Sequence, residues 1–118
     1  MRNFHVERLD AAEIDGVRRC LDAVCDGPFF DDWEFGTLMG VTRQEMSRVR
    51  DAWPGTPTAT SSEDALQMQR VAVGNALGNL LGYPLTNVET ASLRDKWGVD
   101  RSLLGSIHDR LYGRSPEP

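Results

Sequence analysis

Apolar residues recur three or four positions apart along most of this chain, which is the spacing of one face of an α-helix. No segment shows a sustained alternation of apolar and polar residues, so the pattern predicts no strand. The expected fold class is all-α, a compact bundle of about six helices. The predicted helices cover about residues 10–26, 32–39, 42–53, 63–81, 86–97 and 100–111.

The ends of these helices carry local signals. Three helices begin with an oxygen-bearing residue that is followed three positions later by glutamate, the spacing of a capping box. The three pairs are Asp10 with Glu13, Thr42 with Glu45, and Thr86 with Glu89. Glycine or proline is expected to end four of the helices, at Gly27, Gly40, Pro54 and Gly98.

One phrase occurs twice in the chain. Gly40-Val41-Thr42-Arg43 leads into one predicted helix, and Gly98-Val99-Asp100-Arg101 leads into another 58 residues later. The repeat predicts two three-helix units with a Gly-Val turn in each, packed as one domain. The expected boundaries are about 9–54 and 61–113 for the halves, 54–62 for the Pro/Thr/Ser-rich loop that joins them, and 1–118 for the domain.

The longest predicted helix, 63–81, is apolar on nearly every side and carries Gly74 and Gly78, with Gly82 just beyond its end. A glycine inside a helix costs about 1 kcal/mol relative to alanine, so a compensating contact is expected. We expect another helix of the same chain to approach closely along these glycines. Pairing with a second copy along the same face, as a homodimer, is the alternative.

The net charge of −5 is confined to the first third of the chain. Residues 1–35 hold nine acidic residues against four arginines, whereas residues 36–118 are balanced. An acidic surface repels nucleic acid and favours basic partners. No apolar run is long enough to span a membrane, and the N-terminus lacks the apolar core of a signal peptide, so we expect a cytoplasmic protein without a membrane contact.

Residues that could carry catalysis do not form a recognisable pattern. His5 and His108 have no helical partner of metal-ligand type, and no Gly-rich loop follows a strand. Cys20 and Cys25 would point about 140° apart on one helix, so they cannot form a disulfide without unwinding it. We therefore expect no enzyme activity, no metal site and no cofactor.

Residues 32–53 carry a glycine turn between two short helices, with apolar residues where the helices would cross. Over this stretch the chain resembles the helix-turn-helix of bacterial repressors, with Gly36 at the small position and Gly40 in the turn. The resemblance implies a DNA-binding transcription regulator as the alternative function. The residues that would then contact DNA are Arg43, Gln44, Ser47 and Arg50. Acidic residues nearby argue against it, because DNA affinity depends on neutralised phosphates.

Aromatic and acidic residues lie next to one another around the start of this stretch, over residues 29–34. Aromatic side chains beside charges are typical of the centres of protein interfaces. The expected interface residues are Phe29, Phe30, Asp31, Asp32, Trp33 and Glu34. Our first expectation is therefore a small, acidic, non-enzymatic helical regulator or adaptor that acts by binding another protein.

A third expectation is a small-ligand site in a groove between the two halves. Asn75 and Asn79, with Asp32 and Glu34, would supply its polar groups. The two asparagines lie one helical turn apart. They are expected either to be exposed or to be buried and hydrogen-bonded, where they would fix the packing of the long helix.

Overall fold

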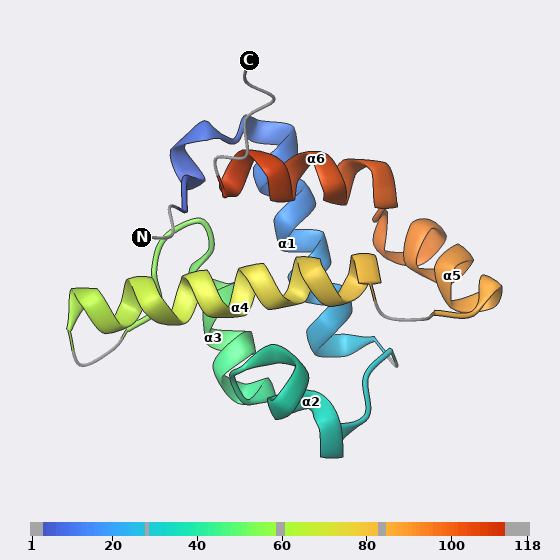
Figure 1. The fold of residues 1–118 in the computed structure, drawn as a ribbon, viewed down its shortest axis with the longest axis horizontal. Coiled ribbons are helices and arrows are strands. Elements are labelled where there is room, and N and C mark those ends of the chain that lie inside the picture. Colours follow the sequence, from blue (N-terminus) through green and yellow to red (C-terminus); the bar gives the residue numbers. More distant parts are fainter. Residues whose placement is uncertain (1–3, 28, 59–60, 83–84, 113–118) are drawn as a thin grey trace.

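The computed structural model describes residues 4–27, 29–58, 61–82 and 85–112, and it confirms the all-α bundle (Figure 1). These residues form six α-helices and one short 3₁₀ helix, with no strand among them. The elements are η1 (Val6–Arg8), α1 (Ala11–Asp26), α2 (Asp32–Met39), α3 (Arg43–Ala52), α4 (Ser62–Gly82), α5 (Asn87–Trp97) and α6 (Arg101–Leu111). Residues 59, 60 and 113, which belong to the expected linker and second half, lie outside the described residues.

The helix ends follow the local chemistry of the sequence. All three expected capping boxes form, each with both of its reciprocal hydrogen bonds. Asp100 caps α6 by accepting a hydrogen bond from the N–H of Ser102 at 2.7 Å. Gly40 and Gly98 end α2 and α5 with φ values of 74° and 69°, a left-handed conformation that glycine adopts without steric cost.

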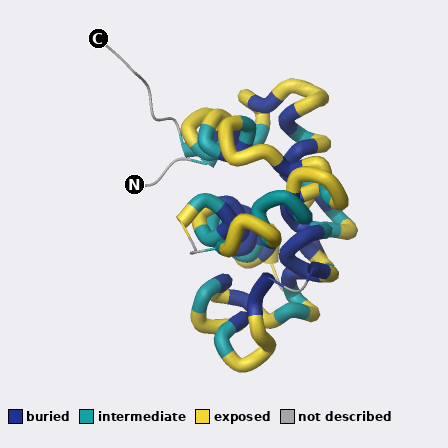
Figure 2. The backbone as a smooth tube through the Cα atoms, turned by 90° about the vertical axis from the view of Figure 1, so that its right-hand side faces the viewer, coloured by how far each residue is buried: buried dark blue, intermediate teal, exposed yellow. Residues whose placement is uncertain are grey.

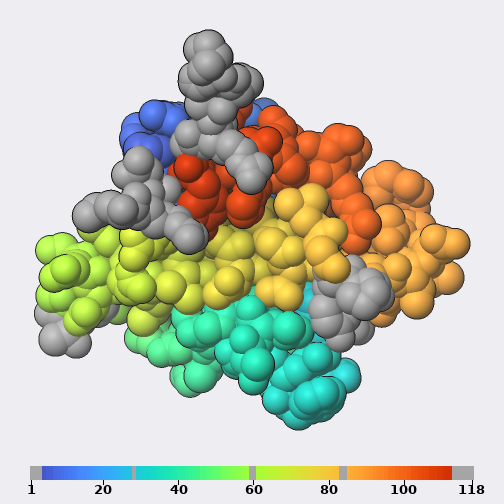
Figure 3. Space-filling view, viewed as in Figure 1, coloured from blue at the N-terminus to red at the C-terminus, as the bar shows by residue number. Residues whose placement is uncertain are grey.

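The centre of the bundle is made by α1 and α4, which cross each other (Figure 1). Helix α1 also packs against α3, α5 and α6. Helix α4 also packs against α2, α3 and α6, and it lies between α6 and α2 in the space-filling view (Figure 3). The middle helix of each half therefore lies on the first helix of the other half: α2 packs on α4, and α5 packs on α1. The two repeats therefore interlock. Along the backbone, buried and exposed stretches follow one another within the helices (Figure 2).

The repeated phrase has the same structural role in both halves. Its glycine ends a helix, its valine is buried, and its third residue caps the next helix. Arg43 donates hydrogen bonds to the carbonyl oxygens of Val24 at 3.2 Å and Cys25 at 3.0 Å, at the C-terminus of α1. Arg101 donates to the carbonyl oxygen of Leu80 at 3.4 Å, near the C-terminus of α4. Carbonyls in the last turn of a helix lack partners within it, so each arginine satisfies the first helix of its own half.

The prediction that another helix packs closely along the glycines of α4 is wrong. A Cβ added at Gly78 or Gly82 would meet nothing within 4 Å beyond the helix itself among the described residues. At Gly74 an added Cβ would collide with the hydroxyl of Tyr112, which belongs to a side chain and not to a packed helix backbone. The reason is that α4 buries a different face, whose core residues are Ala65, Gln69, Ala72, Val73, Ala76, Leu77 and Leu80.

The close helix contact lies at Gly16 of α1 instead. A Cβ there would be 3.1 Å from Cδ1 of Ile107 and 3.2 Å from Cδ2 of Leu103, two residues of α6. These distances are shorter than ordinary van der Waals contact between carbon atoms. Glycine at this position therefore allows α6 to pack closely on α1.

We expect Gly78→Ala to raise the free energy of unfolding by about 1 kcal/mol, because the added methyl group gains helix propensity and meets no neighbour. Equilibrium urea unfolding measures the change. Gly16→Ala is the control, because its gain in helix propensity should be offset by the close contact of the new methyl group with α6. By the same argument, Gly78→Leu should leave the monomer folded. A destabilised Gly78→Ala protein, or stability that falls on dilution of the wild type but not of this variant, would show instead that a second copy covers this face.

Asn75 and Asn79 are hydrogen-bonded and partly buried, the second of the two expected arrangements. Nδ2 of Asn75 donates to the carbonyl oxygen of Met39 at 2.7 Å, and Nδ2 of Asn79 donates to that of Leu38 at 2.9 Å. Both acceptors lie in the last turn of α2, where carbonyls have no helical partner. The asparagines therefore fix the end of α2 on α4, and these amide donors serve the fold.

Candidate functional site

Helix α2 presents one face to the core and another to solvent. Phe35 and Met39 are buried on the side that packs against α4. An open pocket of about 660 Å³ lies at the corner between α2 and the start of α3. The residues that line this pocket, called here the α2 pocket, are Asp32, Trp33, Phe35, Gly36, Thr37, Thr42 and Arg43.

Trp33 is the most exposed large apolar side chain of the described residues, with 81% of its surface accessible. Its indole N–H donates to Oδ2 of Asp31 at 3.3 Å, which orients the ring but does not cover it. Trp53, by contrast, is buried, and its indole N–H donates to the carbonyl oxygen of Ile14 at 2.9 Å. A single exposed apolar residue is common on proteins, but an exposed tryptophan at the rim of a pocket is typical of a binding anchor.

Gly36 forms part of the pocket lining without any internal reason to be glycine. Its φ is not positive, and a Cβ added to it would meet nothing within 4 Å. The close crossing of two helices that the helix-turn-helix resemblance assigned to Gly36 is therefore absent. Since a glycine inside a helix costs about 1 kcal/mol, this position carries a local cost that no contact in the described chain offsets.

Phe29 and Phe30 do not belong to the exposed site, so their assignment as interface residues is wrong. Both side chains are buried, and the ring of Phe29 packs edge-on against Trp97 of α5 with centroids 5.4 Å apart. Both phenylalanines belong to the hydrophobic core of the bundle. Of the expected interface residues, Asp31, Asp32 and Trp33 are exposed and Glu34 is half-buried.

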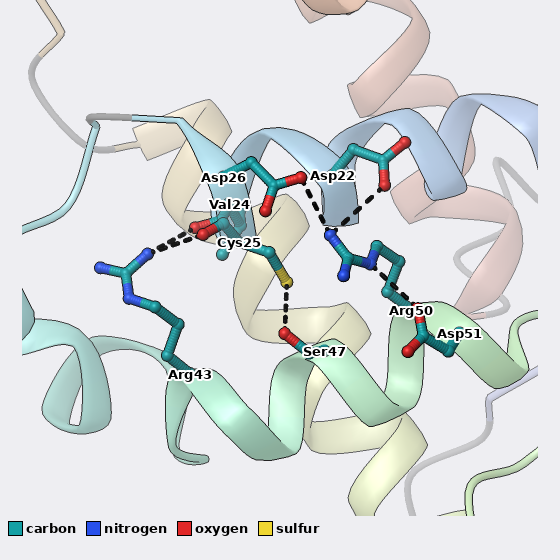
Figure 4. A network of polar contacts seen from close by, with 8 residues as sticks. All are labelled: Asp22, Val24, Cys25, Asp26, Arg43, Ser47, Arg50 and Asp51. Atoms are coloured by element: carbon teal, nitrogen blue, oxygen red, sulfur yellow. Dashed lines mark hydrogen bonds and ion pairs between the residues drawn. The ribbon is translucent and has the colours of Figure 1, made fainter.

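Arg43 forms one wall of the α2 pocket, and its guanidinium group is fully engaged. Nη1 donates to the Val24 and Cys25 carbonyl oxygens (Figure 4), and Nη2 donates to the carbonyl oxygen of Phe30 at 3.0 Å. Nε and Nη2 lie 3.1 Å and 2.9 Å from Oδ1 of Asp32. The five N–H groups of an arginine are therefore all directed at acceptors within the protein.

The guanidinium of Arg43 also lies over the ring of Phe35, with Cζ 4.3 Å from the ring centroid. This cation–π contact and the carbonyl bonds hold the start of α3 against α2 and the end of α1. The arginine is thus a structural tie that shapes the pocket.

The polar face of α3 that could have read DNA packs against α1 (Figure 4). Arg50 donates to Asp26 at 3.0 Å and lies 3.7 Å from Asp22. Ser47 donates its hydroxyl to Sγ of Cys25 at 3.7 Å. Together with Arg43, three of the four candidate DNA contacts are turned inward, and Gln44 is the exposed one.

Burial shifts the pKa values of three groups of α1, the thiols of Cys20 and Cys25 and the carboxyl of Asp22. It raises the pKa of the Cys20 thiol strongly and raises the pKa of Cys25 against the opposing hydrogen bond from Ser47. Burial also raises the pKa of Asp22, although the positive charge of Arg50 opposes the shift. Thiols with raised pKa are poor nucleophiles, so the cysteines are core residues here.

In the described part of the chain, no three histidine, cysteine, aspartate or glutamate side chains are placed so that they could hold a metal ion together. None of the described helices is long and apolar enough to cross a bilayer.

Comparison with known protein families, with curated proteins and with solved structures finds no significant match. The α2 pocket therefore has to be interpreted from its own residues. The sequence pointed to this region through a tryptophan among acidic residues, whereas the interior glycine of α2, Gly36, was interpreted there as a helix-crossing position.

Proposed function

We propose that this chain is a small non-enzymatic binding protein, and that it recognises another protein at the α2 pocket with Trp33 as the anchor. The observation that carries the proposal is the exposure of this one tryptophan at the rim of a pocket, since tryptophan is among the residues that contribute most to binding interfaces. Nearby Asp31 and Asp32 give the surface an acidic rim. The two unpaired cysteines suit a reducing compartment, so the proposal places the protein in the cytoplasm.

A second argument is the rigidity of the pocket. Helix α2 is fixed at its C-terminus by Asn75 and Asn79 and at the adjoining corner by Arg43. A surface that is held in place before binding loses little conformational entropy on association. Short as it is, α2 is therefore a suitable platform for recognition.

DNA binding is supported less well by this geometry. Two of the three arginines of α3, Arg43 and Arg50, are engaged with α1 or with Asp32, which leaves Arg48 and Gln44 on the outer side. A helix that reads the major groove presents several donors to bases and phosphates at once. A titration with mixed duplex DNA at low salt tests this alternative, and we expect no binding at micromolar protein.

The proposal predicts that substitutions in the α2 pocket weaken the binding of a partner, and that a substitution at an open glycine elsewhere leaves this binding unchanged. A photoreactive residue at Thr37 should crosslink the partner in lysate of the source organism. Trp33→Ala should then weaken the affinity for that partner at least tenfold, as for an interface anchor. Gly36→Gln should weaken it as well by filling the pocket, whereas Gly78→Gln on α4 should not.

The two glutamine variants control for stability. Both positions are open, so both substitutions should raise the free energy of unfolding by up to about 1 kcal/mol. A loss of binding in Gly36→Gln alone therefore cannot come from misfolding. If the partner binds the wild type, Trp33→Ala and Gly36→Gln equally well, the α2 pocket is not the binding site.

A further inference from the structure

We infer that the α2 pocket receives a basic side chain, a lysine or arginine of the partner protein, with its cation on the indole face of Trp33 and near the carboxylates of Asp31 and Asp32. The inference rests on the proposed function and names the chemistry of the partner. Three features of the described residues carry it: the exposed ring, the exposed acceptors, and a pocket lining whose one cationic side chain, Arg43, is already engaged by acceptors within the protein.

The ring is available to a cation. Tryptophan is the strongest aromatic partner for cations, and an exposed contact of this kind contributes about 0.5–1 kcal/mol. The structure already pairs cations with rings in this way: Arg43 lies over Phe35, and Nζ of Lys96 lies 4.9 Å from the ring centroid of Trp97. Among the described residues no cation covers the ring of Trp33, and its indole N–H donates to Asp31 at the edge of the ring.

The carboxylates beside the ring are available as acceptors. The side chain of Asp32 is 92% exposed although it pairs with Arg43, so part of its carboxylate remains open to solvent. Asp31 precedes α2 but makes no side-chain capping bond, and it is exposed. With Glu34, this end of α2 carries three acidic residues against the one arginine, which favours a positively charged partner.

The pocket offers little to an acidic partner. Arg43 is the one arginine in its lining, and its N–H groups are directed at the carbonyls of Val24, Cys25 and Phe30 and at Asp32. The hydroxyl of Thr42 accepts the N–H of Glu45 in the capping box. A carboxylate or phosphate entering the pocket would have to displace the bonds of Arg43 to reach a cation, and would otherwise meet only the neutral hydroxyls of Thr37 and Thr42. An ammonium or guanidinium group would find the exposed carboxylates as acceptors.

A pair of peptides tests this directly. Hexa-arginine and hexa-citrulline have nearly the same shape and differ in charge. They are titrated into the ¹⁵N-labelled protein, and the indole N–H signals of its three tryptophans are followed, with Trp33→Phe to assign the signal. We expect hexa-arginine to shift the Trp33 signal and hexa-citrulline to leave it unchanged. Asp31→Asn with Asp32→Asn should weaken the binding about threefold or more.

Asp95→Asn on α5 is the control, because it removes an exposed carboxylate far along the chain and should leave the Trp33 titration unchanged. A shift by both peptides alike, by neither peptide, or equally in the Asp31/Asp32 double variant would overturn the inference. The inference and the proposed function can fail separately. If the crosslinked partner requires Trp33 but binds the double variant as tightly as the wild type, the binding site stands and the basic side chain is wrong.

Discussion

Replacing Arg43 by methionine is expected to lower the free energy of unfolding by about 3 kcal/mol. Methionine keeps much of the apolar stem but removes every donor, so the carbonyls of Val24, Cys25 and Phe30 lose their partner. A hydrogen bond to a charged group contributes about 1.5–3 kcal/mol, and a part-buried carbonyl left unpaired adds a desolvation cost. The cation–π contact with Phe35 is lost at the same time.

The matched control is Arg101→Met, the same position of the repeated phrase in the second half. Arg101 is exposed and donates to Leu80 over the longer distance of 3.4 Å, so we expect a loss of about 1 kcal/mol. Urea unfolding of both variants gives the comparison. If Arg43→Met were as stable as the wild type, Arg43 would not tie α3 to α1, and its assignment as a surface DNA contact would regain support.

Gly40→Ala is expected to destabilise the protein by about 3 kcal/mol, through two effects at one position. An alanine in the left-handed region costs about 1–2 kcal/mol, and Gly40 has a φ of 74°. The new Cβ would also lie 2.8 Å from Cγ1 of Val71 and 3.0 Å from Nδ2 of Asn75. Both atoms belong to α4, so relief of the clash would disturb the contact that positions α2.

Gly98→Ala separates these two effects. Gly98 has the same left-handed conformation, with a φ of 69°, but the atoms in its way are the end of the Arg19 side chain. That side chain is exposed and can move, so we expect the conformational cost alone, about 1–2 kcal/mol. Thermal and urea unfolding should rank the variants in this order. Equal losses would mean that Gly40 is not packed tightly against α4.

Much of the fold could be predicted from the sequence because the signals are local. A capping box involves residues three positions apart, and the boxes that begin at Asp10, Thr42 and Thr86 form as expected. The left-handed glycines that end α2 and α5 are equally local. The repeated phrase indicated a unit used twice. It did not indicate that α2 would pack on the first helix of the second half, or α5 on the first helix of the first half.

The site was less predictable, because exposure depends on residues distant in sequence. Trp33 and Phe29 lie four positions apart and were both expected at the interface, yet Trp33 is exposed and Phe29 packs on Trp97. Arg43 and Arg50 lie on a polar helix face that is typical of a surface, but α1 covers it with carbonyls and carboxylates. A charged side chain can be satisfied by either water or a folded neighbour, and sequence spacing does not distinguish them.

The sequence by itself determined the class of fold, the helix ends and the acidic character of the first third, since each depends on composition or on contacts within one helical turn. Only the tertiary structure decided which face of each helix is covered. Helix α4 shows why: apolar residues lie on nearly all of its sides, so their spacing does not indicate which side is buried. Gly78 and Gly82 have open space around them, and the close contact with α6 is made by Gly16 of α1 instead. Burial is a property of the whole packed chain, because each helix is covered by residues that lie far from it in sequence.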